Sequence, residues 1–160
     1  MRVLAFDAAT TVGWASFASA RAAPVLGTFT LQSYGSDYGK LNCKMLGAVR
    51  MLIGEHHPEL VAFEAPIFMP RDRWHTRRLL VGLVTIIELA AAMASLRCLE
   101  VTPREAKQCL AGDPDADKPA MVAAAKGMGW QVADHHQADA CAIALVTFGV
   151  LARPLEKIRA

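Results

Sequence analysis

The sequence has little of what marks a disulfide-rich or zinc-thiolate protein. Only four of its 160 residues are cysteines, and no two of them form a Cys-x-x-Cys pair. Such pairs are typical of structural zinc sites and of redox motifs. We therefore expect reduced, buried thiols in a protein of the cytoplasm. The four are Cys43, Cys98, Cys109 and Cys141.

The sequence also has no large excess of charge of one sign and only one long apolar run. The formal net charge is +2, which is compatible with nucleic-acid binding but too small to indicate it. No secretory signal is visible, since Asp7 interrupts the apolar start. The one long apolar run, residues 79–96, has Glu88 near its middle, so we expect a buried helix and no membrane partner. Because this helix is apolar nearly all round, we expect its second side, Ala91 included, to contact another copy of the protein.

The order of apolar patterns predicts an α/β fold. The expected strands are residues 3–6, 12–17, 25–31, 60–63 and 98–101, and the first two helices are residues 37–55 and 79–96. Three closing helices are expected after the N-caps Thr102, Asp117 and Asp134. The stretch at residues 70–78 has the composition of a polar, basic connection. No repeat or linker divides the chain, so residues 1–160 are expected to form a single domain, a five-stranded mixed sheet flanked by helices.

Acidic residues follow two of the expected buried strands. Asp7 and Glu64 come directly after the strands at 3–6 and 60–63, and they converge if those strands are neighbours. His136 and Asp139, three residues apart near a helix start, share a helix face. Each residue alone also fits a turn, a solvated strand end or a polar helix start. As an ordered set, three carboxylates and one imidazole predict a site for Mg²⁺ or Mn²⁺.

A basic, aromatic segment follows Glu64 in the sequence. Arginines beside a cleft can contact phosphates, and an aromatic ring offers a flat face to an unstacked base. The alternative is an exposed connection whose charges only increase solubility. We favour contact with DNA because a probable metal site lies next to it in the sequence. The residues concerned are Phe68, Arg71, Arg73, Trp74, Arg77 and Arg78.

Three segments resemble the signature blocks of the RuvC family of Holliday junction resolvases. They are residues 6–15 (Phe-Asp-Ala-Ala-Thr-Thr-Val-Gly-Trp-Ala), 62–69 (Ala-Phe-Glu-Ala-Pro-Ile-Phe-Met) and 137–144 (Gln-Ala-Asp-Ala-Cys-Ala-Ile-Ala). The resemblance implies an RNase H-like fold and a homodimer that makes paired incisions across a four-way DNA junction. It also implies two divalent ions, Mg²⁺ or Mn²⁺, in each active site.

The resemblance assigns the metal ligands residue by residue. Asp7, Glu64 and Asp139 stand at the positions of acidic ligands, and His136 stands where many members have an aspartate. Two further basic residues, Lys107 and Lys118, fall in residues 101–118, a stretch that is also similar to the family. Together with Thr10 and Thr11 they are candidates for phosphate contact.

Other functions remain open at this point. The YqgF-type nucleases of ribosomal RNA maturation share the first and the last aspartate, but the block at residues 62–69 favours the resolvases. A module that binds junctions without cutting them would tolerate the loss of ligands, and all four are present here. An actin-like kinase shares the Asp-x-x-x-Thr-x-Gly pattern that begins at Asp7 but needs a second domain. The residues give no indication whether a helicase acts as a partner.

Overall fold

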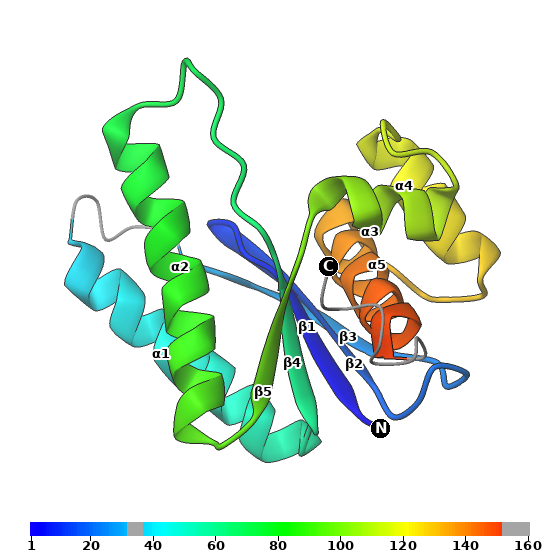
Figure 1. The fold of residues 1–160 in the computed structure, drawn as a ribbon, viewed down its shortest axis with the longest axis horizontal. Coiled ribbons are helices and arrows are strands. Elements are labelled where there is room, and N and C mark those ends of the chain that lie inside the picture. The colour runs from blue at the N-terminus through cyan, green and yellow to red at the C-terminus, as the bar shows by residue number, and fades with distance from the viewer. Residues whose placement is uncertain (32–36, 152–160) are drawn as a thin grey trace, which may run out of the picture.

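Five strands form one mixed sheet in the computed structural model, which describes residues 1–31 and 37–151 (Figure 1). The strands are β1 (Val3–Asp7), β2 (Thr11–Phe17), β3 (Val25–Thr30), β4 (Leu60–Glu64) and β5 (Arg97–Val101), in the order β3-β2-β1-β4-β5. The first three pair antiparallel, whereas β1, β4 and β5 are parallel. The predicted five-stranded mixed sheet is therefore confirmed.

The sheet is covered on both faces because its central strand is apolar on both faces. Along β1, Val3 and Ala5 point into one core, whereas Leu4 and Phe6 point into the other. All four side chains are fully buried. One face is covered by α1 (Tyr38–His56) and α2 (Trp74–Met93), and the other by α5 (His135–Leu151), with α3 (Pro103–Ala111) and α4 (Lys118–Gly127) outside it (Figure 1).

The helix starts follow the capping rules that the sequence indicates. The side chain of Asp37 accepts a hydrogen bond from the first turn of α1, and Asp117 does the same for α4. Thr102 and Glu105 form a reciprocal capping box at the start of α3. These bonds satisfy backbone N–H groups that have no partner within the helix.

Helix α2 differs from its prediction at both ends. It begins at Trp74, five residues before the expected start, because its first turn consists of polar and basic residues that hide the helical pattern. It ends at Met93 instead of residue 96. In the turn that follows, Ser95 has a positive φ of 57°. A glycine is common at such a position and would have indicated the helix end, but the sequence has none there. Residues 74–78 thus belong to the helix and not to a loop.

One side of α2 packs on the sheet and the other side is exposed. The inner side carries Leu83, Val84, Ile87, Ala90 and Ala91, all buried. Ala91 is fully buried in the chain's own core, so its expected place at a contact with another copy is wrong. Neither α2 nor any other helix in the described part of the chain has the length and apolarity needed to cross a membrane.

Cysteine burial was predicted correctly only in part. All four thiols are free, as expected. Cys141 is buried and Cys98 partly so, and burial raises the pKa of each thiol to about 12. Cys43 and Cys109 are exposed on the outer sides of α1 and α3. The apolar neighbours of these two in the sequence do not surround them in space.

Candidate active site

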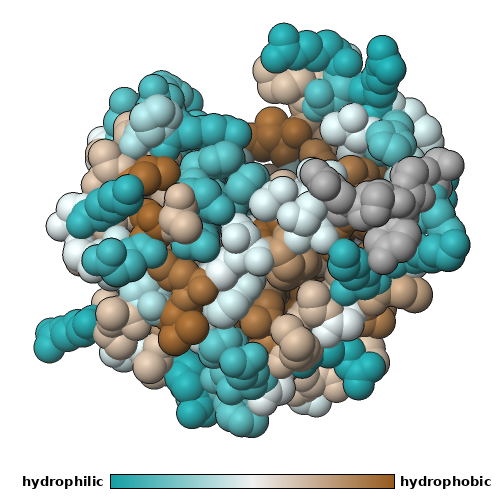
Figure 2. Space-filling model, turned by 180° about the vertical axis from the view of Figure 1, so that it is seen from behind, coloured by the Kyte–Doolittle hydropathy of each residue, from teal (hydrophilic) through white to brown (hydrophobic). Residues whose placement is uncertain are grey.

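Two carboxylates meet at one edge of the sheet. Asp7 ends β1 and Glu64 ends β4, and these strands are parallel neighbours with Phe6 opposite Phe63. The sequence predicted this convergence only on condition that the strands adjoin, and the sheet order meets that condition. The surface is notched at the end of the molecule toward which both strands run (Figure 2). Ligand sites of sheets with parallel strands commonly lie at such carboxyl ends.

A glycine brings the last helix against this edge. Gly13 of β2 lies opposite Asp7 in the sheet. A Cβ atom at Gly13 would be 2.1 Å from the backbone oxygen of His136, a distance that no side chain could occupy. The absence of a side chain thus allows the first turn of α5 to reach the end of β1. Nothing local in the sequence indicates this role of Gly13, because its partner His136 lies more than a hundred residues away.

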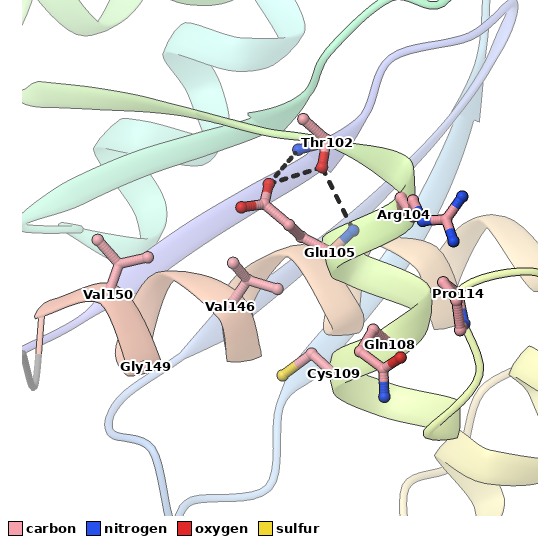
Figure 3. Close-up of a pocket in the computed structure, with 9 residues that line it drawn as sticks. All are labelled: Thr102, Arg104, Glu105, Gln108, Cys109, Pro114, Val146, Gly149 and Val150. Carbon is pink, nitrogen blue, oxygen red and sulfur yellow. Dashed lines mark hydrogen bonds between the residues drawn. The ribbon is translucent and has the colours of Figure 1, made fainter. Parts of the chain in front are cut away.

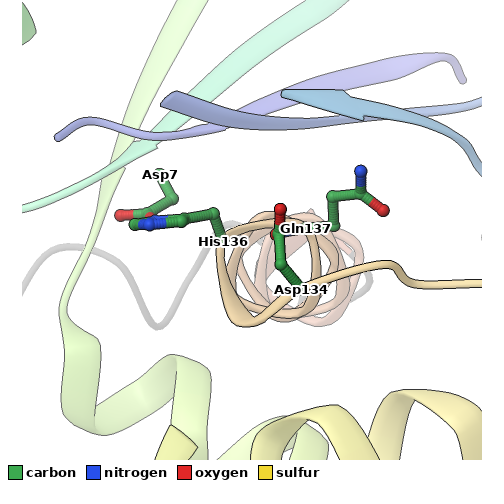
Figure 4. Close-up of polar contacts among 4 residues, drawn as sticks. All are labelled: Asp7, Asp134, His136 and Gln137. Carbon is green, nitrogen blue, oxygen red and sulfur yellow. The ribbon is translucent and has the colours of Figure 1, made fainter. Parts of the chain in front are cut away.

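His136 and Asp7 are in direct contact. Nδ1 of His136 lies 2.6 Å from Oδ2 of Asp7, and the side chains are only 20% and 15% exposed. Figure 4 shows the two side chains meeting, one from α5 and one from β1. The hydrogen bond to Asp7 raises the pKa of His136, because the carboxylate stabilises the imidazolium. The predicted pairing of these residues in one site is consistent with this geometry.

The other polar residues at the start of α5 serve the helix. The carboxylate of Asp134 accepts a hydrogen bond of 2.9 Å from the backbone N–H of Gln137, as an N-cap does. The side chain of Gln137 in turn accepts from the backbone N–H of Ala133. In Figure 4 both side chains lie apart from Asp7. This cap fixes where α5 begins and therefore where His136 points.

Burial and mutual repulsion act on the remaining carboxylates. Burial, followed by the charges of Asp7 and Asp139, raises the pKa of Glu64 to about 8. Burial, followed by the charge of Asp7, raises the pKa of Asp139 to about 6. Lys107 opposes both shifts without cancelling them. The four predicted site residues therefore act on one another electrostatically, and their negative charges are not compensated by the surrounding protein.

This donor set suits a hard divalent cation. Carboxylate oxygens are the preferred ligands of Mg²⁺ and Mn²⁺, and a cation would remove the repulsion that raises the two carboxyl pKa values. Within residues 1–31 and 37–151 no three such side chains are already arranged as a metal cage. The direct bond between Asp7 and His136 joins two of the expected donors to each other.

Two predicted phosphate contacts lie beside the acidic residues. Lys107 acts on the charges of Glu64 and Asp139, and Lys118 acts on Asp139 and His136. Lys118 is the first residue of α4 and is exposed. The structure thus brings both lysines to the site. Thr10 is also exposed, in the turn between β1 and β2, whereas Thr11 is half-buried at the start of β2.

The basic segment is more ordered than a solvated connection. Arg77 donates a hydrogen bond of 3.0 Å to the carbonyl of Met69, and its guanidinium lies 6.0 Å from the Phe68 ring centroid. Arg77 therefore stabilises the segment after β4, and its contact with DNA stays a prediction. Arg71 and Arg73 are exposed, and Trp74 is 75% exposed.

A groove joins this segment to the start of α1. It has a volume of about 540 Å³ and combines aromatic and basic side chains from three parts of the chain. Its lining includes the predicted Phe68, Trp74, Arg77 and Arg78, together with Tyr38 and Asn42 of α1. Tyr38 and Asn42 could not be predicted to line it, since nothing local in α1 indicates that its first turn faces α2.

A larger pocket lies away from the acidic residues. It occupies about 710 Å³ between α3 and the end of α5 (Figure 3). Thr102 and Glu105, which line it, are already bonded to each other in the capping box, as the dashed lines show. None of the predicted site residues lines this pocket. Its size therefore does not make it the place of the chemistry.

The sheet order and the helices on its two faces define an RNase H-like fold, and acidic residues at the ends of β1 and β4 and near the start of α5 are the expected ligands of a nuclease site on it. The sequence model for crossover junction endodeoxyribonuclease RuvC matches residues 29–147, and the chain belongs to the RuvC family. Glu64, His136 and Asp139 fall inside the matched span, and Asp7 precedes it. A comparison with curated protein sequences gives no significant match.

Solved structures share the fold at low sequence identity. The structure of Thermus thermophilus RuvC is 23% identical, with a TM-score of 0.75 over 94% of this chain and 96% of that one. T. thermophilus RuvC in complex with a Holliday junction substrate is 23% identical, with a TM-score of 0.80 over 97% and 99%. The yeast mitochondrial Holliday junction resolvase Ydc2 is 12% identical, with a TM-score of 0.64 over 89% and 75%.

Proposed function

We propose that the chain resolves four-way DNA junctions by divalent-metal-dependent phosphodiester hydrolysis at Asp7, Glu64, His136 and Asp139. Membership of the crossover junction endodeoxyribonuclease family gives the reaction class. The observation that carries the assignment of the site is the presence of three carboxylates near one edge of the sheet, where burial, followed by the charges of Asp7 and Asp139, raises the pKa of Glu64 to about 8. Carboxylates with strongly shifted pKa values are typical of functional sites.

The ligand roles follow from where each side chain starts. Asp7 is central, because its charge acts on both Glu64 and Asp139, so it would contact both ions. Glu64 would hold one ion, and Asp139 with His136 the other. When bound, two divalent ions supply a more acidic attacking water and stabilise the charge that builds on the scissile phosphate. Lys107 and Lys118 would hold the DNA phosphates next to them.

His136 decides when this site is available. Below its raised pKa the imidazolium of His136 is paired with one oxygen of Asp7, so the ring cannot serve as a metal ligand. Loss of the proton weakens that pair and leaves a neutral ring nitrogen and a free carboxylate oxygen. We therefore infer that proton release from His136 accompanies metal binding.

A homodimer through the outer side of α2 completes the proposal. Val81, Leu89 and Met93 are 46%, 45% and 55% exposed on this helix, and all are apolar. Leu89 and Met93 are four residues apart and therefore neighbours on the helix surface, and Val81 lies about two turns earlier, within about 120° of both around the helix axis. Burying this face against a second copy would give two active sites, as paired incisions require.

Cleavage of three substrates separates this function from its alternatives. The purified chain is incubated with Mg²⁺ or Mn²⁺ and a four-way DNA junction, a DNA duplex or a structured RNA. The resolvase proposal expects paired cuts in the junction and little cutting of the other two. Preferred cutting of RNA would favour the YqgF-type alternative. Tight junction binding without cleavage in either metal would favour a binding module.

A further inference from the structure

The first turn of α2 contradicts the usual preferences of a helix start. Arg73 at the N-cap forms no side-chain cap bond, and the first turn has no acidic residue. His75, Arg77 and Arg78 follow instead, at the end of the helix whose dipole is already positive. Rules of this kind are broken mainly where function requires it. Concentrated positive charge at this place suits the phosphates of DNA.

One tyrosine from another helix contacts two of these basic side chains. The hydroxyl of Tyr38, the first residue of α1, lies 2.6 Å from Nδ1 of His75, and the two ring centroids are 5.5 Å apart. The guanidinium carbon of Arg78 lies 4.3 Å from the centroid of the Tyr38 ring, within the range of a cation–π contact. All three side chains are at least partly exposed, so the arrangement faces solvent.

We propose that Tyr38 is a positioning residue that holds Arg78 and His75 ready for the backbone phosphates of one DNA arm. An arginine that moves freely must lose rotamer freedom when it binds, and one that already rests on a ring has lost part of it beforehand. Contact with the ring face leaves the N–H groups at the guanidinium edge available for phosphate oxygens. The inference rests on the proposed function, which supplies DNA as the ligand.

A double-mutant cycle tests this coupling. Junction binding is measured without divalent ions, so that no cleavage occurs, for the wild type, Tyr38→Leu, Arg78→Gln and the double variant. We expect each single change to weaken binding about two- to tenfold. This is the effect expected when one long side chain must be ordered during binding, or when its phosphate contact is lost. The double variant should then bind more tightly than the product of the two single effects predicts, because Tyr38 acts partly through Arg78 and only its contact with His75 is left to lose. Multiplying effects, or an unchanged affinity of Tyr38→Leu, would overturn the proposal.

Matched variants separate positioning from a general structural role. Arg104 is an exposed arginine on α3 outside the groove, so Tyr38→Leu and Arg104→Gln should combine without coupling. Tyr38→Phe keeps the ring beneath Arg78 and loses only the hydroxyl bond to His75, so it should bind more tightly than Tyr38→Leu. If Tyr38→Leu does not fold, the cycle is made with Tyr38→Phe and His75→Gln, and additivity there counts against the proposal.

The test of Tyr38 can fail or succeed independently of the test of the proposed resolvase function. A wild type that binds duplex and junction equally well and cuts neither would refute the resolvase assignment. The coupling of Tyr38 with Arg78 could still be measured on either DNA. Conversely, a wild type that cuts junctions while Tyr38→Leu and Arg78→Gln show no coupling would refute only the role of Tyr38.

Discussion

His136 is the one site residue whose side chain is not a carboxylate. Imidazole is a poorer ligand for Mg²⁺ than for Mn²⁺, because Mg²⁺ prefers hard oxygen. We therefore predict higher activity with Mn²⁺ than with Mg²⁺ at equal concentration, and a shift toward Mg²⁺ in His136→Asp. His136→Ala should lose most cleavage. Steady-state rates in the two metals check this.

The fall of the cleavage rate at acidic pH provides a second check on His136. Because the bond to Asp7 raises its pKa, wild-type activity should fall with acid already above about pH 6.5, the ordinary value for histidine. His136→Asp should move that limb to lower pH. His135 is the control, since it lies about 100° around the helix. A dead His135→Ala beside an active His136→Ala would contradict the assignment.

The raised pKa values of Glu64 and Asp139 predict how the stability of the metal-free protein depends on pH. Both have a higher pKa in the folded protein than in the unfolded chain, so folding takes up protons. Their contribution is most favourable below the unfolded values near 4, and it is lost as pH rises, through about 6 for Asp139 and about 8 for Glu64. His136, whose pKa is also raised, acts in the same direction.

Unfolding in EDTA between pH 4 and pH 8.5 measures this effect. The difference in stability between the wild type and Glu64→Gln should change with pH, with the wild type losing relative stability toward pH 8. Added Mn²⁺ should restore the wild type most strongly at high pH, because the ion replaces the protons. A difference that is flat across this range would show that Glu64 does not carry the uncompensated charge.

At the scale of elements, the contact between β2 and α5 depends on Gly13. Gly13→Ala would place a Cβ atom 2.1 Å from a backbone oxygen, which the chain can relieve only by moving α5. We predict a loss of about 1–3 kcal/mol in the free energy of unfolding, typical of overpacking, together with weaker metal binding. Gly47→Ala in α1 is the matched control, because its Cβ meets nothing within 4 Å and should slightly stabilise the helix. Equal stability of the two variants, measured by denaturant unfolding, would contradict this account.

Helix α2 shows where a dimer can be tested. Leu89→Glu places a charge on the exposed apolar side and should yield folded monomers, which sedimentation and circular dichroism would detect together. Ala91→Glu would instead place a charge in the chain's own core and should unfold the protein. Wild-type protein that sediments as a monomer at micromolar concentration would contradict the proposed interface.

The same helix shows which features the sequence could reveal. Its inner side follows the helical period of Leu83, Ile87 and Ala90, so the element was predictable. Its start was not, because a basic first turn resembles a loop in composition. Two sides of α2 are rich in small, apolar residues, and the sequence does not indicate which of them faces the sheet. The sequence prediction therefore placed Ala91 on the wrong side. That choice depends on the neighbouring helix and not on local pattern.

At the scale of the whole molecule, most of the acidic site could be predicted from short blocks of sequence. Asp7 and Glu64 each end a strand whose apolar run is evident, and parallel pairing then brings them together. The bond between His136 and Asp7 could not be predicted, because it depends on the approach that Gly13 permits. Tyr38 was missed for a similar reason, since its partners lie on another helix. Contacts between distant elements arise only from packing.

The metal-dependent site at the end of β1 is tested most directly by comparing DNA binding and cleavage in Asp7→Asn. The asparagine has nearly the same shape but removes the negative charge that acts on Glu64 and Asp139. We predict that the variant binds a four-way DNA junction about as tightly as the wild type and does not cut it in Mg²⁺ or Mn²⁺. Equal loss of binding and cleavage would mean that Asp7 is structural. Retained cleavage would contradict a metal-dependent site at the end of β1.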